Sequence, residues 1–158
     1  MHSTHNPEQY LQQAYLGEIG GEATFRSLAD ALPERADALN LLAEVERLTA
    51  DYLRTHLLTQ ISTETVDEHR AEAVNRVTDI GKLSWSGVID FAIPIVDEAL
   101  TTFKAAEQQA PSELLGVYRM YTAHEQALAE YFRLERDGSD GTHVLEKYLD
   151  RVRPTIPG

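Results

Sequence analysis

The chain has 158 residues and a formal net charge of −12, with 14 basic residues against 26 acidic ones. This excess of acids disfavours binding to nucleic acids and to anionic membranes, because phosphate groups are bound by clustered lysine and arginine. The absence of cysteine excludes disulfides, thiolate metal sites and cysteine nucleophiles, so any metal ion would have to be bound by histidine and carboxylate side chains.

The length fits one domain with a sizeable core, which we expect to cover residues 1–158, with irregular ends at 1–6 and 153–158. No stretch approaches the roughly 18 consecutive apolar residues of a membrane-spanning helix. The opening residues, MHSTHNPEQY, lack the basic and apolar regions of a secretory signal. We therefore expect a cytoplasmic protein without a membrane partner.

The first predicted helix covers residues 7–31, because Asn6 is a favourable N-cap and a proline follows at the first helical position. Its apolar stripe contains two acids, Glu18 and Glu22. Glu22 has Arg26 four residues further on, so we expect these two to pair. Three glycines, at positions 17, 20 and 21, indicate that another helix or a ligand approaches closely.

The second predicted helix covers residues 33–60, and Glu46, Thr49 and His56 lie along one edge of its apolar face. The stretch 61–84 has a thinner apolar stripe, which predicts a partly exposed helix. Such a helix could form the long crossover that some four-helix bundles contain. We expect the histidines outside the apolar stripes to lie at the surface: His56, His69 and His143.

The next predicted helix, residues 85–109, has no acid on its core face, and Pro94 should kink it. We expect this core face to comprise Val88, Ile89, Ala92, Ile95, Val96, Ala99 and Phe103. The last two predicted helices cover residues 112–138, starting from a cap at Ser112, and residues 142–152. We expect the short last helix to pack across the end of the bundle.

The helix over 112–138 carries the most informative residue pair of the chain. Its apolar stripe is interrupted at Glu125, and His124 lies beside it. A charge on the buried face of a helix needs a partner, a metal ion or a shared proton, because an unpaired one costs several kcal/mol. The sequence therefore predicts a polar site in the core.

These helices resemble the ferritin-like, rubrerythrin-like family of di-iron carboxylate proteins. LGEIGGEATFRSLA places Glu18 seven residues before an aromatic, ERLTADYL has Glu46 in the family's Glu-x-x-His position, and YTAHE keeps His124 and Glu125. The resemblance implies an all-α, ferritin-like four-helix bundle with a long helical crossover and a short C-terminal helix. Thr49 replaces one family histidine, and Tyr121 replaces one glutamate.

Two interpretations of this incomplete di-metal site remain open. In the first, Glu18, Glu46 and His124 bind iron or manganese, with Glu125 or Glu22 as an auxiliary ligand. In the second, no metal is bound and the acids share a proton in a closed network. The donors of that network would be His124, Thr49, Tyr118 and Tyr121. The missing ligands favour the metal-free interpretation.

Three functions follow from these interpretations. The incomplete ligand set favours a binding or structural protein, with copies associating through a helix face. The alternative is a non-haem metal-dependent oxidoreductase or oxygenase that uses Glu18, Glu46, His124 and Glu125. A third hypothesis is a small-molecule binder whose pocket lies along the glycine-rich face of the first helix.

Overall fold

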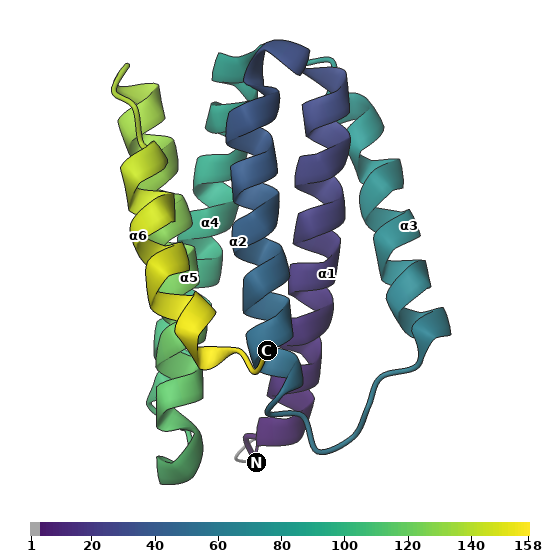
Figure 1. Cartoon of the computed structure of the whole chain (residues 1–158), viewed down its shortest axis with the longest axis vertical. Coiled ribbons are helices and arrows are strands. Elements are labelled where there is room, and N and C mark those ends of the chain that lie inside the picture. Colours follow the sequence, from purple (N-terminus) through teal and green to yellow (C-terminus); the bar gives the residue numbers. More distant parts are fainter. Residues whose placement is uncertain (1–3) are drawn as a thin grey trace.

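The computed structural model describes residues 4–158, and all of its regular secondary structure is helical (Figure 1). The all-α prediction is therefore confirmed for this part of the chain. Three short 3₁₀ turns, Pro33–Arg35, Ser112–Leu114 and Arg153–Thr155, accompany the α-helices. The α-helices are α1 (Pro7–Ala31), α2 (Ala36–Arg54), α3 (Thr63–Ile80), α4 (Trp85–Glu107), α5 (Leu115–Arg136) and α6 (Thr142–Val152).

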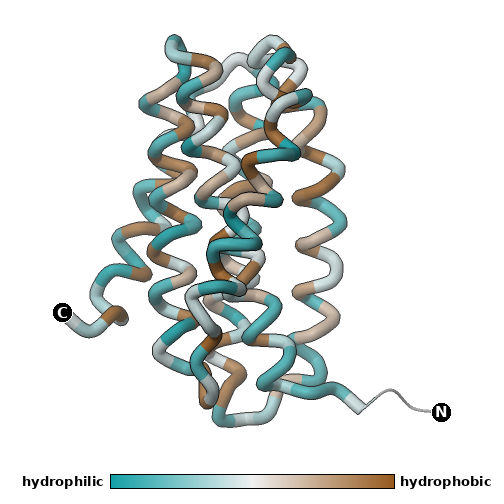
Figure 2. The backbone as a smooth tube through the Cα atoms, turned by 90° about the vertical axis from the view of Figure 1, so that its right-hand side faces the viewer, coloured by the Kyte–Doolittle hydropathy of each residue, from teal (hydrophilic) through white to brown (hydrophobic). Residues whose placement is uncertain are grey.

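The helices form two antiparallel hairpins, α1–α2 and α4–α5, which α3 connects (Figure 1). Helix α3 packs along the outside of α1 and returns the chain to the end where α2 began, so that α4 runs in the same direction as α2. The partly exposed helix predicted within residues 61–84 is thus present as α3, and it ends where Gly81 lies against Ala31. In Figure 2, apolar (brown) and polar (teal) residues are interspersed along the helices, as expected for helices that bury one face.

Helix α6 contradicts the expectation that it packs across the end of the bundle. It lies lengthwise against α2 and α5 (Figure 1). The reason is the width of its apolar face, because an eleven-residue helix with five buried positions needs a groove between two helices to cover them. Those positions are Val144, Leu145, Tyr148, Leu149 and Val152.

Helix boundaries follow local capping where a cap is present. Asn6 accepts a hydrogen bond from the Gln9 backbone N–H, as predicted for the start of α1. The Ser112 prediction is wrong, because no side chain caps α5 or the 3₁₀ turn before it. Helix α2 ends at Arg54, six residues before the predicted end. Beyond this end the chain turns, and the backbone N–H groups of residues 58 and 59 donate hydrogen bonds to the Glu8 carboxylate of α1 instead of to helix carbonyls.

Helix α4 also departs from its predicted core face. Val88, Ile89 and Val96 are buried, but Ile95 is 53% exposed. Ile95 lies four residues after Phe91, which is 47% exposed, so the two share an outer edge of the helix. The helix continues through Pro94, and the predicted kink stays a prediction. Of the three histidines expected at the surface, His143 is exposed, while the other two are partly buried.

The core runs along the inside of the two hairpins and under α6. Its fully buried side chains include Leu39, Leu42 and Val45 of α2 and Tyr131 and Phe132 of α5. A smaller apolar cluster joins α1 and α2 to α3. Within residues 4–158, every helix is too short or too polar to cross a lipid bilayer.

Candidate metal centre

Four polar side chains lie in the middle of this core, and three helices supply them. Glu18 projects from α1, Glu46 from α2, and His124 and Glu125 from α5. Their exposed fractions are 4%, 5%, 0% and 7% in that order. Each occupies a position on the apolar stripe of its helix, so packing that stripe inward also buries the polar group. The predicted burial of these residues is confirmed.

The imidazole of His124 is the centre of the cluster. Its Nε2 atom lies 2.9 Å from Glu18 Oε1, 3.2 Å from Glu125 Oε2 and 3.6 Å from Glu46 Oε2. Glu18, Glu46 and His124 each offer one ligand atom such that all three atoms lie within 4.8 Å of one another. Glu125 contacts the same nitrogen but falls outside that closest set. The predicted convergence of acids from separate helices with an imidazole is therefore confirmed.

A hydrogen bond of the second ring nitrogen fixes the orientation of the His124 imidazole relative to the acids. Its Nδ1 donates a hydrogen bond to the backbone carbonyl of Tyr121, one turn earlier in α5. Nε2 therefore points at the carboxylates. A hydrogen bond from the distal ring nitrogen to a carbonyl is the arrangement that orients metal-binding histidines in proteins.

Two atoms of the cluster lack a directed hydrogen bond among the described residues. They are His124 Nε2 and Glu18 Oε2, both fully inaccessible to solvent. The short distance from Nε2 to Glu18 thus reflects attraction between charges and not an aligned donor and acceptor. Buried polar atoms are nearly always satisfied, so this pair calls either for a proton shared among the clustered groups or for a further partner at the centre of the cluster.

The pKa shifts within the cluster also indicate that the site favours an added positive charge. Burial alone lowers the pKa of His124, but the carboxylates of Glu18 and Glu125 outweigh it and raise the pKa well above its usual range. Burial raises the pKa of Glu46 well above its usual range, and the Glu18 carboxylate raises it further. The site therefore favours an added positive charge, which either protons or a metal cation can supply.

The closed metal-free network that we expected does not form with all of its predicted donors. The Thr49 hydroxyl donates to the Val45 carbonyl and lies 2.6 Å from the Tyr148 hydroxyl. The Tyr118 hydroxyl is 2.7 Å from His5 Nε2. Because both hydroxyls are engaged elsewhere, neither Thr49 nor Tyr118 satisfies the acids.

Aromatic rings cover one side of His124. The ring of Tyr121 stacks on the imidazole with centroids 4.8 Å apart, and Phe103 of α4 packs 4.3 Å from Tyr121. Tyr148 of α6 is 6.3 Å from the imidazole, centroid to centroid. Helix α4 thus contributes an aromatic wall and no acid, as its sequence predicted. The sequence did not predict that Tyr148 lies near His124, because the position of Tyr148 depends on where α6 packs.

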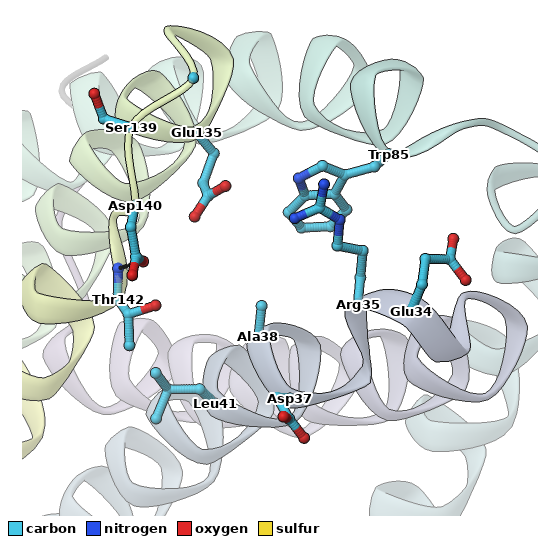
Figure 3. A pocket seen from close by; sticks show the side chains of 11 residues that line it. Glu34, Arg35, Asp37, Ala38, Leu41, Trp85, Glu135, Ser139, Asp140 and Thr142 are labelled. Atoms are coloured by element: carbon cyan, nitrogen blue, oxygen red, sulfur yellow. Dashed lines mark hydrogen bonds between the residues drawn. The ribbon is translucent and has the colours of Figure 1, made fainter.

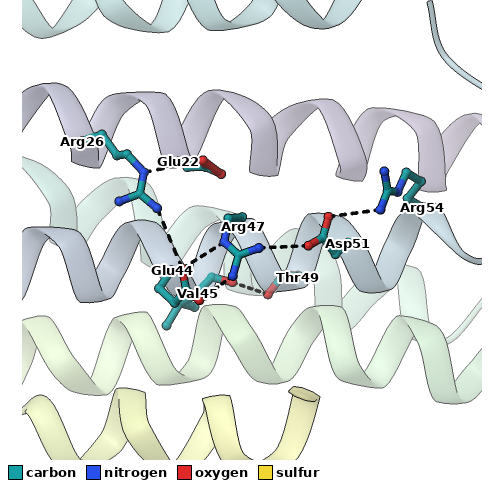
Figure 4. A network of polar contacts seen from close by, with 8 residues as sticks. All are labelled: Glu22, Arg26, Glu44, Val45, Arg47, Thr49, Asp51 and Arg54. Atoms are coloured by element: carbon teal, nitrogen blue, oxygen red, sulfur yellow. Dashed lines mark hydrogen bonds and ion pairs between the residues drawn. The ribbon is translucent and has the colours of Figure 1, made fainter. Parts of the chain in front are cut away.

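Glu22, the alternative auxiliary ligand, lies outside the cluster. Its carboxylate is 3.6 Å from Arg26, which confirms the predicted pair, and Arg26 also reaches Glu44 of α2. Figure 4 shows these residues as the start of a chain of ion pairs that continues along α2. Glu22 is therefore neutralised at the outer edge of the α1–α2 hairpin.

An apolar pocket of about 180 Å³ reaches two residues of the cluster. Glu46 and Glu125 are part of its wall, and so is Gly21 of the glycine-rich segment of α1. The other lining residues are mostly apolar: Thr24, Phe25, Leu28, Ile80, Val88, Phe91, Ala92, Ile95, Val96, Leu128 and Phe132. Small molecules can therefore approach two of the four polar side chains without crossing a charged surface.

A wider depression of about 630 Å³ lies at another part of the molecule. Figure 3 shows Arg35 and Trp85 on one side of it, with the guanidinium 5.3 Å from the indole centroid, and Glu135 and Asp140 on the opposite side. None of the four clustered residues lines it. Its charged groups come from the 3₁₀ turn Pro33–Arg35, the first turn of α2, the last turn of α5 and the loop before α6, so it does not take part in the buried centre.

Comparison with known proteins adds no relative to this description. The chain matches no protein-family model, no curated protein and no solved structure. The functional assignment therefore depends on the geometry of the buried cluster and its pocket.

Proposed function

We propose that the protein binds one divalent transition-metal ion through Glu18, Glu46 and His124, with Glu125 as an additional donor. The observation that carries this proposal is the convergence of one buried ligand atom each from Glu18, Glu46 and His124, where Glu18 Oε2 and His124 Nε2 have no directed hydrogen bond. Oxygen donors with one imidazole suit iron, manganese or zinc. Iron and manganese fit best because carboxylates are the majority of the donors.

A single ion is supported by the residues that surround the cluster. A second ion would need further ligands, but the positions available for them hold Thr49 and Tyr121. Thr49 is bonded to Val45 and Tyr148, and the Tyr121 ring is stacked on His124. One group of at least three converging ligands is present within residues 4–158.

The proposal includes a ferritin-like arrangement of the four longest core helices. Its support is the order of the elements: two antiparallel hairpins, α1–α2 and α4–α5, with a crossover helix between them that returns the chain to the starting end. Ligands projecting inward from facing helices are the usual way in which such bundles build a metal site. The chain departs from that scheme by contributing no carboxylate from α4.

A second candidate function is a non-haem metal-dependent oxidoreductase. The observation that favours it is the apolar pocket, which has Glu46 and Glu125 in its wall. A bound iron or manganese ion supplies redox or Lewis-acid chemistry. The chain's own contribution would be to fix the imidazole through Tyr121, to exclude water with the apolar lining, and to admit a small substrate. A purely structural or binding role for the bundle is the remaining function if no metal binds.

The decisive experiment compares two carboxylates one turn apart on α1. The chelator-treated protein, Glu18→Gln and the matched control Glu22→Gln are titrated with Mn(II) and with anaerobic Fe(II), and bound metal is counted by elemental analysis. We expect one ion per chain in the native protein and in Glu22→Gln, and affinity reduced at least tenfold in Glu18→Gln. Two ions per chain, or no ion in the native protein, would contradict the proposal.

The oxidoreductase candidate has its own test. Oxygen consumption by the Fe(II)-loaded protein is measured with and without a chemical reductant, and compared with His124→Ala and with His143→Ala, whose histidine is exposed on α6. Catalysis that disappears in His124→Ala and persists in His143→Ala supports this function. Metal binding without oxygen consumption leaves a metal-binding protein and removes the oxidoreductase.

A further inference from the structure

We propose that the apolar pocket is a binding site for a small neutral molecule with an apolar body, the size of one ring or a short alkyl chain, and one oxygen donor at its end. Short aliphatic alcohols and phenols belong to this class. The inference is independent of metal binding, because it uses Glu46 and Glu125 only as the polar groups at the inner end of the pocket.

The lining of the pocket determines the apolar body of the ligand. Most of its lining side chains are aliphatic or aromatic, and α1, α4 and α5 supply most of them. The one hydroxyl among them, on Thr24, donates to the Gly20 carbonyl, so towards a ligand it can act only as an acceptor. At about 180 Å³ the pocket resembles in size the apolar cavities of about 150 Å³ that bind benzene.

The exposed fractions of the lining residues distinguish the inner end of the pocket from its mouth. Glu46 and Glu125 are 5% and 7% exposed and mark its inner end. Phe91 and Ile95 are 47% and 53% exposed and mark its mouth at the outer edge of α4. An entering molecule therefore contacts apolar side chains first, and its leading end stops against the two carboxylates.

The charge at the inner end determines the polar group of the ligand. Among residues 4–158, no lysine or arginine lines the pocket, so an anionic head such as a fatty-acid carboxylate would be buried beside Glu46 and Glu125 without a counter-charge. A neutral hydroxyl avoids this cost and can donate a hydrogen bond to a carboxyl oxygen of either residue. The pocket therefore selects neutral over anionic ligands of the same length.

The test uses a homologous series of alcohols on the folded, full-length protein. Dissociation constants for n-butanol to n-decanol are measured by calorimetry, with and without Mn(II). Each added methylene should strengthen binding about fourfold until the pocket is full, after which the affinity levels off. Octanoate, the anion of matched length, should bind the metal-free protein at least tenfold more weakly than octanol does.

Two variants of α4 locate the binding site. Ala92→Phe places a ring in the pocket and should abolish the dependence on chain length, whereas Ala105→Phe adds the same ring at an exposed position of the same helix and should change nothing. Ala92→Leu is the milder variant if Ala92→Phe unfolds, and the affinity should then level off at a shorter alcohol. Circular dichroism checks that each variant is folded.

The outcomes separate this inference from the proposed function. Chain-length-dependent binding that Ala92→Phe or Ala92→Leu weakens supports the pocket whether or not Mn(II) binds. Mn(II) binding with no alcohol binding, or equal binding by the native protein and both Ala92 variants, overturns the pocket and leaves the metal site intact. Octanoate binding as tightly as octanol overturns the selection for a neutral end.

Discussion

At the scale of single residues, Gly21 controls the position of a proposed ligand. A Cβ atom at this position would lie 2.9 Å from Glu46 Cδ and 3.1 Å from its Oε1, closer than such contacts allow. We expect Gly21→Ala to displace the Glu46 carboxylate and to weaken Mn(II) binding about ten- to hundredfold. The measurement is a Mn(II) titration followed by electron paramagnetic resonance.

The neighbouring glycine provides the control for this prediction. A Cβ on Gly20 would make an ordinary contact, 3.8 Å from the Ala73 Cβ. Gly20→Ala should therefore keep the native metal affinity and gain up to about 1 kcal/mol of stability from helix propensity. Equal Mn(II) affinities for Gly21→Ala and the native protein would remove Glu46 from the ligand set.

At the scale of the elements, one buried hydrogen bond attaches α6 to α2. Thr49 donates to the Val45 carbonyl, so the Tyr148 hydroxyl must be the donor in their 2.6 Å contact. Thr49→Val leaves that hydroxyl buried without an acceptor and should cost about 1–3 kcal/mol. In Tyr148→Phe, Thr49 keeps its bond to Val45, so the cost should be smaller. Urea denaturation of the single and double variants measures both.

The free-energy coupling between Thr49 and Tyr148 tests this prediction. The double variant should lose less stability than the sum of the single variants, because neither hydroxyl is then left alone. Tyr118→Phe combined with Thr49→Val is the matched control, since the Tyr118 hydroxyl is bonded to His5 instead. Strictly additive costs for Thr49 and Tyr148 would show that their contact contributes nothing.

The ion pairs along the outer edge of α2 should make the free energy of unfolding depend on pH. Glu44 bonds to Arg47, and this hydrogen bond lowers the pKa of Glu44 more than its partial burial raises it. A carboxylate with a lowered pKa in the folded state contributes stability above its unfolded pKa, and that contribution is lost as the pH falls through the folded value. Urea denaturation should therefore show that Glu44→Gln costs up to about 1 kcal/mol at pH 6 and little at pH 3. An equal cost at both values would contradict this assignment.

At the scale of the whole molecule, a central ion would join three helices of the bundle. A ligand that binds only the folded chain stabilises it by mass action, by about 2.7 kcal/mol at a concentration one hundred times Kd. For a chain of this length, that predicts a rise in Tm of about 5–10 °C with Mn(II). Thermal unfolding followed by circular dichroism measures the shift, which a chelator should reverse. Glu18→Gln is the control: with its affinity reduced at least tenfold, it should show a rise of about half the native value or less at the same Mn(II) concentration. A native Tm independent of Mn(II) would contradict a ligand set that spans α1, α2 and α5.

Most of the helical architecture could be predicted from the sequence because its determinants are local. Asn6 and the following proline fix the start of α1, and the period of apolar residues gives α6 its observed limits, Thr142–Val152. The same period places Glu18, Glu46 and Glu125 on or beside apolar stripes, which predicts a polar site in the core. It also places Glu22 on the stripe of α1, and only packing showed that Glu22 stays outside the cluster with Arg26.

Only the tertiary structure decided which atoms meet and what surrounds them. That Thr49 bonds to Tyr148, that α6 lies lengthwise, and that Ile95 faces outward all depend on distances between helices, which the period of one helix does not constrain. The apolar pocket exists because residues far apart in the chain line one space between α1, α4 and α5. The sequence determined that charges would be buried, and packing determined that His124 Nε2 would face three carboxylates.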